Sequence, residues 1–417
     1  MKVKRKAKAI LVPLLVGLIP LVGLPSEYSD TNNANFSSAI SGAKLNISEI
    51  HGDLESLRAK LSEAEGSLNA FEPSIAELSI AIADQLVENG EFMDALVSYR
   101  RALHITRANT GLESDQQTFI LGRIFLTYIH LGDTAAAANT LRRVTAIYML
   151  TQTANSPEFV KHLRYRGGWH LATYEKALVR PDLQHLIEAH NAFDSLRRLN
   201  IRTGIDYDPE IYRSLSITNH AMAVHVKHQL LFGKISQQTY RAGDNSALID
   251  FSINSYRRGR NQLREGVRHA ERSGQPEDLI EATIQLADWE QLFSKRYTAK
   301  KLYLKAYDHI STLPEDHALR AVFTQPQILP THTTDSVLTD FYAPKESIEV
   351  AVVFDLSHWG RSRNVRLSAS DQADIQTPLH AKRSAIRRAE RSLFRPVIIG
   401  GKTVGQKAVP HTLYEPI

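Results

Sequence analysis

Apolar residues recur at helical spacing from about residue 46 to about residue 310. Within this region, "IAIADQLVENGEFMDALVSYRRALHI" places small residues on both sides of a glycine, followed by a tyrosine. Small side chains let two antiparallel helices approach closely, and glycine allows the tight turn that joins them. The pattern therefore predicts a helical hairpin over residues 74–108.

The same order of residues occurs twice more. The copy at 116–148 has Gly132 in the place of Gly90, 42 residues further on, and the copy at 279–310 has Ser294 there. Residues 157–271 have helical periodicity without a repeat that aligns. Repeated helical units stack because none can bury its apolar face alone, so we predict a helical solenoid over residues 46–312.

The hairpin residues resemble the tetratricopeptide repeat (TPR). The residues that carry the resemblance are Ala83, Gly90, Ala95, Tyr99 and Ala102. It implies a groove that binds a peptide or a protein, and it makes Tyr99 and Tyr128 candidate partner-binding residues.

The periodicity is lost after residue 312. Residues 313–346 contain four prolines, which favour a linker. Alternation then predicts strands at 348–357 and 363–370, with Val350, Val352 and Phe354 on one face and Gly360 in the turn between the strands. We expect a helix at 377–394, buried through Leu379, Ile386, Ala389 and Leu393, and a last strand within 402–416.

This order of strands, turn and helix resembles the C-terminal domain of TonB-type periplasmic proteins. The residues that carry the resemblance are Val352, Val353, Phe354, Asp355, Gly360, Asn364, Val365, Ala385, Ala389, Phe394, Arg395, Pro396, Gly401 and Lys402. It implies a small α+β domain at 347–417, an antiparallel three-stranded sheet plus a helix, that binds an extended partner at a sheet edge. Val404, Val409 and Leu413 in the last strand are candidate partner-binding residues. The predicted fold class is thus mainly α, a TPR-like solenoid followed by this domain.

Four arginines form a stripe on the helix expected at 377–394: Arg383, Arg387, Arg388 and Arg391. Such a stripe is either a solvated face or a binding surface for an anionic partner, such as lipid headgroups, cell-wall polymer or an acidic protein segment.

The N-terminal segment combines positive charge with an apolar run. Five lysines and arginines within residues 1–8 precede the uncharged residues 10–24, which are too short to span a bilayer as a straight helix. Residues 1–24 are therefore expected to be a signal peptide or a membrane anchor, followed by a flexible leader at 25–45. A signal peptide would release the protein into the periplasm, and an anchor would tether it there to the inner membrane. A cytoplasmic protein is the remaining alternative.

Charge and motifs exclude two classes of ligand. The formal net charge is +5, and the five basic residues of the first eight account for all of it, so the body gives no support to nucleic-acid binding. Gly401, Lys402 and Thr403 match the end of a phosphate-binding loop, but Pro396 replaces the glycine that the motif requires five residues earlier. No nucleotide is expected.

The remaining candidate residues have ordinary explanations. His220, His225 and His228 are near one another, but no carboxylate at matching spacing completes a metal site. Trp169 and Trp289 are expected in the core or in a groove. The sequence therefore predicts no metal, no cofactor and no catalytic residues.

These observations predict a non-catalytic adaptor in the periplasm that binds a protein or peptide, including an outer-membrane protein, by its repeat groove and its sheet edge. Two alternatives stay open. One is a TonB-type energy transducer that acts on outer-membrane receptors, and the other is a cell-envelope enzyme.

Overall fold

The computed structural model defines the arrangement of most of the chain after residue 51. It describes residues 52–67, 69–151, 156–176, 182–204, 207–231, 251, 253–330, 347–373 and 376–416. The expected signal or anchor segment and the leader lie outside the described residues.

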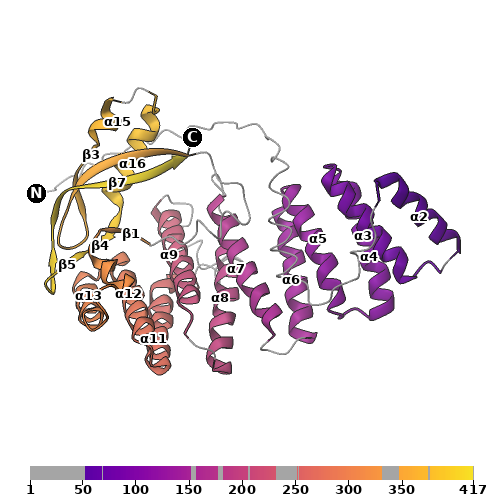
Figure 1. The fold of residues 1–417 in the computed structure, drawn as a ribbon, viewed down its shortest axis with the longest axis horizontal. Coiled ribbons are helices and arrows are strands. Elements are labelled where there is room, and N and C mark those ends of the chain that lie inside the picture. Colours follow the sequence, from indigo (N-terminus) through magenta and orange to yellow (C-terminus); the bar gives the residue numbers. More distant parts are fainter. Residues whose placement is uncertain are drawn as a thin grey trace, which may run out of the picture.

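Helices pack side by side in a row from α2 to α13 (Figure 1). Their bounds are α2 Leu54–Ser67, α3 Pro73–Glu88, α4 Phe92–Thr110, α5 Gln116–His130, α6 Thr134–Thr151, α7 Pro157–Lys176, α8 Leu183–Thr203, α9 Pro209–Leu231, α11 Ser255–Ser273, α12 Pro276–Leu292 and α13 Arg296–Ile310. The predicted helical solenoid is confirmed. The region without an aligned repeat also folds into packed helices, with α7 against α8 and α9 against α11.

The three aligned hairpins turn in the same way. Gly90, Gly132 and Ser294 have φ values of 80°, 72° and 61°, in the left-handed region that glycine adopts most easily. In each turn the next amide donates to a carbonyl five residues earlier; these bonds are Glu91 to Leu86, Asp133 to Tyr128 and Lys295 to Glu290, at 2.8, 3.0 and 2.8 Å. Ser294 is therefore equivalent to the two glycines although its side chain differs.

The hairpins are held together by buried small and aromatic side chains. Ala83, Ala95 and Ala102 are each 0% exposed, and Tyr99 is 1% exposed. Trp169 and Trp289 are fully buried, so both are core residues.

The last part of the chain forms a small α+β unit, called here the strand unit (residues 347–416). It is preceded by η4 Ala318–Phe323 and β1 Gln327–Leu329, and its elements are β2 Ser347–Leu356, β3 Ser362–Leu367, α15 Ala369–Ala373, α16 Leu379–Arg391, β4 Leu393–Arg395, β5 Val397–Ile399, β6 Lys402–Val404 and β7 Gln406–Pro416. The main sheet is antiparallel with the order β3-β2-β7. Val350, Val352 and Phe354 are buried beneath α16. The predicted three-stranded sheet plus helix is confirmed.

Several local predictions for this unit were wrong. The second strand ends at Leu367, and α15 follows it. The helix ends at Arg391, and Leu393 begins β4, because residues 393–395 pair with β1 and do not continue the helix. Pro396 additionally keeps Arg395 extended. The expected last strand is two strands, β6 and β7.

Gly400 and Gly401 form the two-residue turn between β5 and β6. Both have positive φ, 56° and 72°, and Ile399 pairs with Lys402 across the turn. Type I′ hairpin turns need positive φ at both central residues. The Gly-Gly-Lys sequence is therefore a hairpin turn, and a strand rather than a helix follows Gly401.

The strand unit is docked on the last helical hairpin (Figure 1). Arg395 on β4 bonds to Asp288 on α12, and the Trp359 carbonyl accepts a bond from Gln291 Nε2. Ile398 is buried among residues of α12, α13 and η4. The short strand β1, which precedes the strand unit, pairs with β4.

Candidate partner-binding site

Strand β7 forms one edge of the main sheet. It is eleven residues long and pairs with β2 on one side, and no described strand pairs with its other side. An unpaired edge exposes a row of main-chain donors and acceptors that can pair with another extended chain. The prediction that the last strand is a sheet edge therefore agrees with the observed strand order.

Two hydrogen bonds show which main-chain groups of β7 face outward. The Ala351 carbonyl accepts from Ser368 on the β3 side, so Ala351 does not bond to its β7 neighbour Thr412. The N–H and C=O of Thr412 consequently point away from β2. Main-chain groups of residues two apart on a strand point to the same side, so those of Tyr414 also point away from β2. In agreement, the Tyr414 carbonyl accepts a bond from Arg388 Nη1 at 3.0 Å.

Proline at position 410 fits this alternation. Pro410 lies opposite Val353, two residues before Thr412, so its nitrogen also faces the open edge. Because proline has no N–H, it is tolerated where no donor to the neighbouring strand is needed. The outward-facing main-chain groups of Pro410, Thr412 and Tyr414 thus form a row that we call the β7 edge, in which the Tyr414 carbonyl is already bonded to Arg388.

A carboxylate fixes the start of β7. Asp355 Oδ1 accepts from the Ala408 amide at 3.1 Å, and Asp355 Oδ2 accepts from Asn364 Nδ2 at 2.8 Å. Ala408 and Asn364 both have positive φ and lie where the strand registers shift. The bond from Asn364, followed by that from Ala408, lowers the pKa of Asp355. The carboxylate therefore stays ionised and holds a bulge on each side of β2.

Beside the β7 edge, α16 and the helical row enclose a cleft of about 610 Å³, called here the α16 cleft. Its lining residues are His220, Leu292, Leu329, Ser384, Arg387, Arg388, Arg391, Ser392 and Leu393. Arg388 belongs to both features, because it lines the cleft and also donates to β7. Three of the four predicted arginines thus lie together at one cleft, and Arg383 does not line it.

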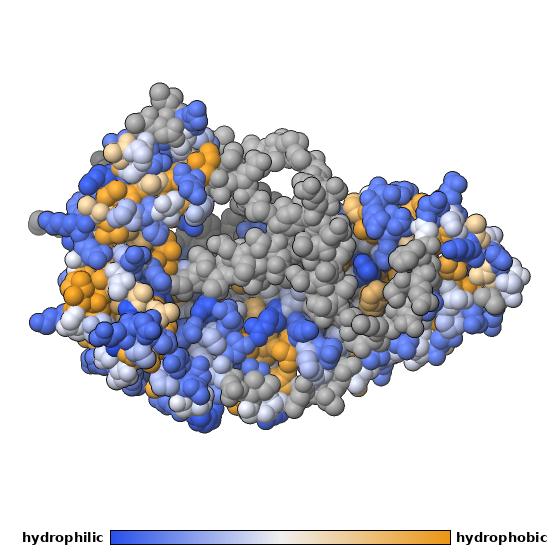
Figure 2. Space-filling view, viewed as in Figure 1, coloured by the Kyte–Doolittle hydropathy of each residue, from blue (hydrophilic) through white to orange (hydrophobic). Residues whose placement is uncertain are grey.

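The buried face of α16 differs from the predicted one. Ala381, Ala385 and Ala389 are buried against the sheet, whereas Leu379 is 71% exposed. Alanines at every fourth position let the helix approach the sheet closely. Short side chains on the inner face leave the arginines on the outer one. In Figure 2, apolar residues also gather on the visible face of the strand unit, at the left.

The other predicted partner-binding residues are buried or half-buried. Tyr99 is buried and donates to Asp84, so its side chain is not available to a partner. Tyr128 is half-buried and accepts a bond from Arg100 at 2.7 Å. Val409 and Leu413 are core residues of the strand unit, and Val404 packs against that core. In β7, main-chain groups face outward and these side chains do not.

Sequence reasoning missed the residues that the helical row contributes to the cleft. His220, Leu292 and Leu329 come from three separate segments and have no common motif. Thr412 and Tyr414 were missed because a sequence shows side chains, while strand pairing uses the main chain. Pro410 was the residue in the sequence that could indicate which main-chain groups of β7 face the open edge, because a proline nitrogen has no donor for a neighbouring strand.

The histidines that lie near one another in the sequence contact other side chains where the structure describes them. His225 contacts Tyr174, with 3.1 Å between Nδ1 and the hydroxyl, and His220 packs against Phe293; the side chain of His228 lies outside the described set. Among the residues that the structure describes, no three His, Cys, Asp or Glu side chains gather to hold a metal ion. Over the same residues, none of the helices has the length and apolar composition that crossing a membrane requires.

Comparison with known proteins gives likeness in fold only. No protein-family model and no curated protein sequence matches the chain. A crystal structure of nearly identical TPR-like repeats of a putative kinesin light chain from Podosopora anserina is 13% identical, with a TM-score of 0.34; the match covers 59% of this chain and 99% of that one. A variant of the same repeats with one substitution is 14% identical with a TM-score of 0.33, and the match covers 57% and 96%. BtubC (BKLC) from P. vanneervenii is 14% identical with a TM-score of 0.31, and the match covers 66% and 94%.

At such TM-scores these likenesses carry no argument about function. The equivalent turns at Gly90, Gly132 and Ser294 and the buried alanines of the paired helices define a TPR-like solenoid in this chain. Arrays of this kind generally mediate protein–protein interaction, because stacked repeats form extended binding surfaces.

Proposed function

We propose that this protein is a non-catalytic adaptor of the periplasm that binds an extended segment of a partner protein at the β7 edge. The observation that carries the proposal is the outward direction of the Thr412 main chain on a long edge strand. An incoming strand would pair with these groups by main-chain hydrogen bonds. Acidic side chains of the partner would then reach Arg387, Arg388 and Arg391 at the α16 cleft.

Two further features support the proposal. The order β2, β3, α16 and β7 is the order on which the resemblance to TonB C-terminal domains rests, and that resemblance implies binding by strand addition. The basic and apolar N-terminal residues are of the kind that direct a chain across the inner membrane.

The test removes one outward donor from β7. A photo-crosslinking amino acid is placed at Tyr414 of the full-length protein in cells, alone and together with Thr412→Pro or Thr412→Ala. We expect crosslinking to a protein in the unaltered background and in Thr412→Ala, and loss of that product in Thr412→Pro, because proline deletes the outward N–H and keeps the ladder to β2. An equal yield from Thr412→Pro would contradict strand addition.

Location is tested separately. Mass spectrometry of the mature N-terminus should show either a chain that starts near residues 24–27 or an uncleaved chain anchored by its N-terminal segment. In both cases, protease added to spheroplasts should digest the residues that follow this segment, because they lie outside the inner membrane. A protease-resistant chain that begins at Met1 would contradict a periplasmic location.

The alternative function is that of a TonB-type energy transducer acting on outer-membrane receptors. The same order of strands and helix favours it. It requires the N-terminal segment to stay uncleaved, so a mature chain that starts near residues 24–27 would eliminate it.

A further inference from the structure

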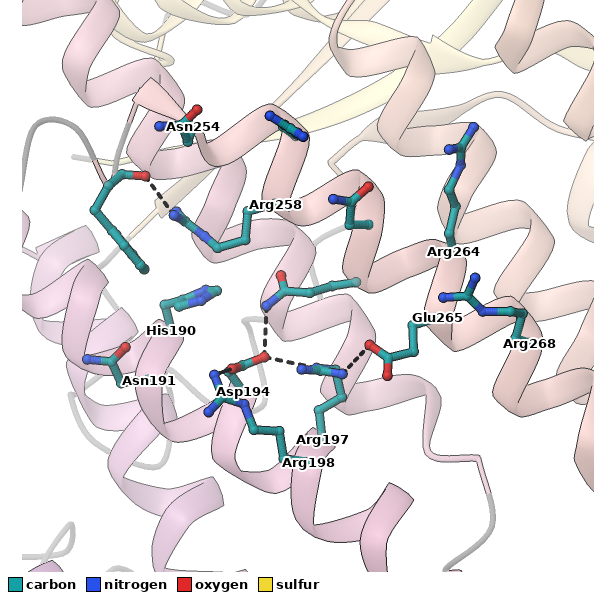
Figure 3. A pocket seen from close by; sticks show the side chains of 14 residues that line it. His190, Asn191, Asp194, Arg197, Arg198, Asn254, Arg258, Arg264, Glu265 and Arg268 are labelled. Atoms are coloured by element: carbon teal, nitrogen blue, oxygen red, sulfur yellow. Dashed lines mark hydrogen bonds and ion pairs between the residues drawn. The ribbon is translucent and has the colours of Figure 1, made fainter.

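A larger groove lies on the helical row, apart from the strand unit. Helices α8 and α11 form its walls (Figure 3). Asn219 of α9 bonds to two of the lining residues, Gln262 and Arg258. The groove has a volume of about 920 Å³. We call it the α8–α11 groove, and it shares no lining residue with the α16 cleft.

Arginines dominate this groove. Six of its fourteen lining residues are arginines: Arg197, Arg198, Arg257, Arg258, Arg264 and Arg268. Only two lining residues are acidic, Asp194 and Glu265. The lining of the groove therefore carries a formal charge of +4 with histidine neutral. The chain after residue 8 has no net charge, so this positive charge is local.

The two acidic residues are already used within the protein. Asp194 bonds to Arg197 at 2.9 Å, forms an ion pair with Arg198 at 2.5 Å, and accepts from Gln262 Nε2 at 2.8 Å. Glu265 forms an ion pair with Arg197 that joins the two walls. These bonds fix the spacing of the walls and leave neither lining carboxylate for the remaining arginines.

Three arginines at the rim keep their charge exposed. Arg257, Arg264 and Arg268 are solvent-exposed and form no ion pair with any residue that the structure describes. Arg264 and Arg268 are one helical turn apart and so lie on the same side of α11. They present guanidinium groups that bind carboxylates in a bidentate manner.

A buried histidine adds an unpartnered polar atom. His190 is 3% exposed and lines the groove, and its Nδ1 has no hydrogen-bond partner among the described residues. Burial, together with the nearby Arg258, lowers the pKa of His190 to about 4, so the ring is neutral at pH 7. A neutral imidazole can accept or donate one bond to a ligand.

The lining also offers groups that suit a polypeptide backbone. Asn191, Asn254 and Asn261 line the groove, and an asparagine side chain can donate to a peptide carbonyl and accept from a peptide amide. One face of the phenylalanine in this lining is already occupied, because the guanidinium of Arg258 lies 3.5 Å from the centre of the Phe251 ring. The ring of His190 also contacts Phe251 edge-on, which limits the stacking surface for a nucleic-acid base.

We propose that the α8–α11 groove binds an extended acidic segment of a partner protein. Carboxylates of the segment pair with Arg257, Arg264 and Arg268, and the asparagine side chains bond to its main chain. This site is independent of the β7 edge, since it uses other elements and another kind of contact.

The experiment measures binding of the full chain to a fluorescent peptide by anisotropy. The probe is a peptide of about twelve residues rich in Asp and Glu, and its control has Asn and Gln at the same positions. We expect the acidic probe to bind at least about ten times more tightly than the neutral one, and its affinity to fall as salt increases.

Variants locate the binding. The double variant Arg264→Gln/Arg268→Gln should lose at least about tenfold in affinity, because two carboxylate contacts are removed. Arg272→Gln is the matched control, since Arg272 lies one turn further on α11, is exposed, and does not line the groove. Its loss should be less than about twofold, as expected for a screened surface charge that makes no direct contact with the ligand. Circular dichroism establishes that each variant is folded.

Several outcomes would overturn the proposal. These are equal binding of the acidic and neutral peptides, an unchanged affinity of the double variant, or an equal loss in Arg272→Gln. Tighter binding of single-stranded DNA or polyphosphate than of the acidic peptide would assign the groove to another class of ligand. Thr412→Pro should leave peptide binding unchanged, which separates this site from the β7 edge.

Discussion

Arg395 and Asp288 join the strand unit to the helical row by two parallel hydrogen bonds. Arg395 Nε lies 3.0 Å from Asp288 Oδ1, and Nη2 lies 2.6 Å from Oδ2. Tyr303 also donates to Asp288 Oδ1, at 2.8 Å. All three side chains are buried.

The first aligned hairpin contains the same arrangement. Asp84 accepts a bond from Tyr99, fifteen residues later, and forms an ion pair with Arg123 of the next hairpin at 3.6 Å. Asp288 and Tyr303 have the same separation, and Arg395 supplies the arginine. Arg395 of the strand unit therefore makes with the last hairpin the contact that Arg123 of the next hairpin makes with the first.

Replacing Arg395 should weaken this junction strongly. Arg395→Met leaves the carboxylate of Asp288 buried without its cation, and loss of one partner of a buried pair costs about 3–5 kcal/mol. We expect a lower urea midpoint and faster proteolysis near residue 330.

A double variant provides the control. Asp288→Asn combined with Arg395→Met removes both charges, so its loss of stability should be smaller than the sum of the two single losses. Strict additivity would contradict direct coupling between these side chains.

Two glycines with almost the same φ should respond differently to alanine. A Cβ on Gly360 (φ 73°) would lie 1.9 Å from the Phe394 carbonyl oxygen, whereas a Cβ on Gly401 (φ 72°) would meet nothing within 4 Å. Gly360→Ala should lower the free energy of unfolding by about 3 kcal/mol or more, since it adds a steric clash to the backbone strain. Gly401→Ala should lower it by only about 1–2 kcal/mol.

Thermal unfolding of the two variants measures this difference. Because the Gly360 carbonyl also accepts from the Phe394 amide at 2.8 Å, its variant should in addition loosen the strand unit from α12. Equal costs at the two positions would show that the close approach at Gly360 is unimportant.

The turn residue Ser294 should be improved by glycine. Its φ of 61° is costly for a residue with a Cβ, and the gain from removing that cost exceeds the added chain entropy of glycine. We expect Ser294→Gly to stabilise the protein by about 0.5–1 kcal/mol and Gly90→Ser to destabilise it by about 1 kcal/mol. Calorimetry of both variants checks the opposite signs.

Stability should fall as the pH drops below about 6.5, the usual pKa of histidine. Burial, with a further effect of Arg166, lowers the pKa of His162 to about 3. The folded state then binds fewer protons than the unfolded state between these values, so the contribution of His162 is complete above about pH 6.5 and is lost towards about pH 3. Each pKa unit corresponds to about 1.4 kcal/mol.

The variant His162→Phe isolates this contribution. The ring of His162 stacks on Tyr148, which phenylalanine can also do, while the titration is removed. Unfolding in urea from about pH 7 to about pH 4 should show a shallower decline than in the unaltered protein.

The sequence was informative where a local pattern determines the structure. Ala83, Gly90 and Ala95 mark a hairpin because close helix packing and a left-handed turn need small residues. Val350 and Val352 mark a strand because one face of the sheet is buried. Both patterns were read correctly without knowledge of what packs against them.

The sites depend on contacts between distant segments, which a sequence does not display. Arg395 stood out only as part of a local motif, and its partner Asp288 lies 107 residues earlier. The basic groove did leave a signal, because Arg257, Arg258, Arg264 and Arg268 of its lining fall within twelve residues of the sequence. A count of net charge concealed it, since acidic residues elsewhere balance these arginines.

Because Arg395 and β4 hold the strand unit on α12 and α13, the separation between the β7 edge and the α8–α11 groove is constant. A ligand that carried both an extended strand and an acidic stretch would gain avidity only if the chain between them matched that span. Rigid attachment thus makes linker length in the ligand a determinant of selectivity.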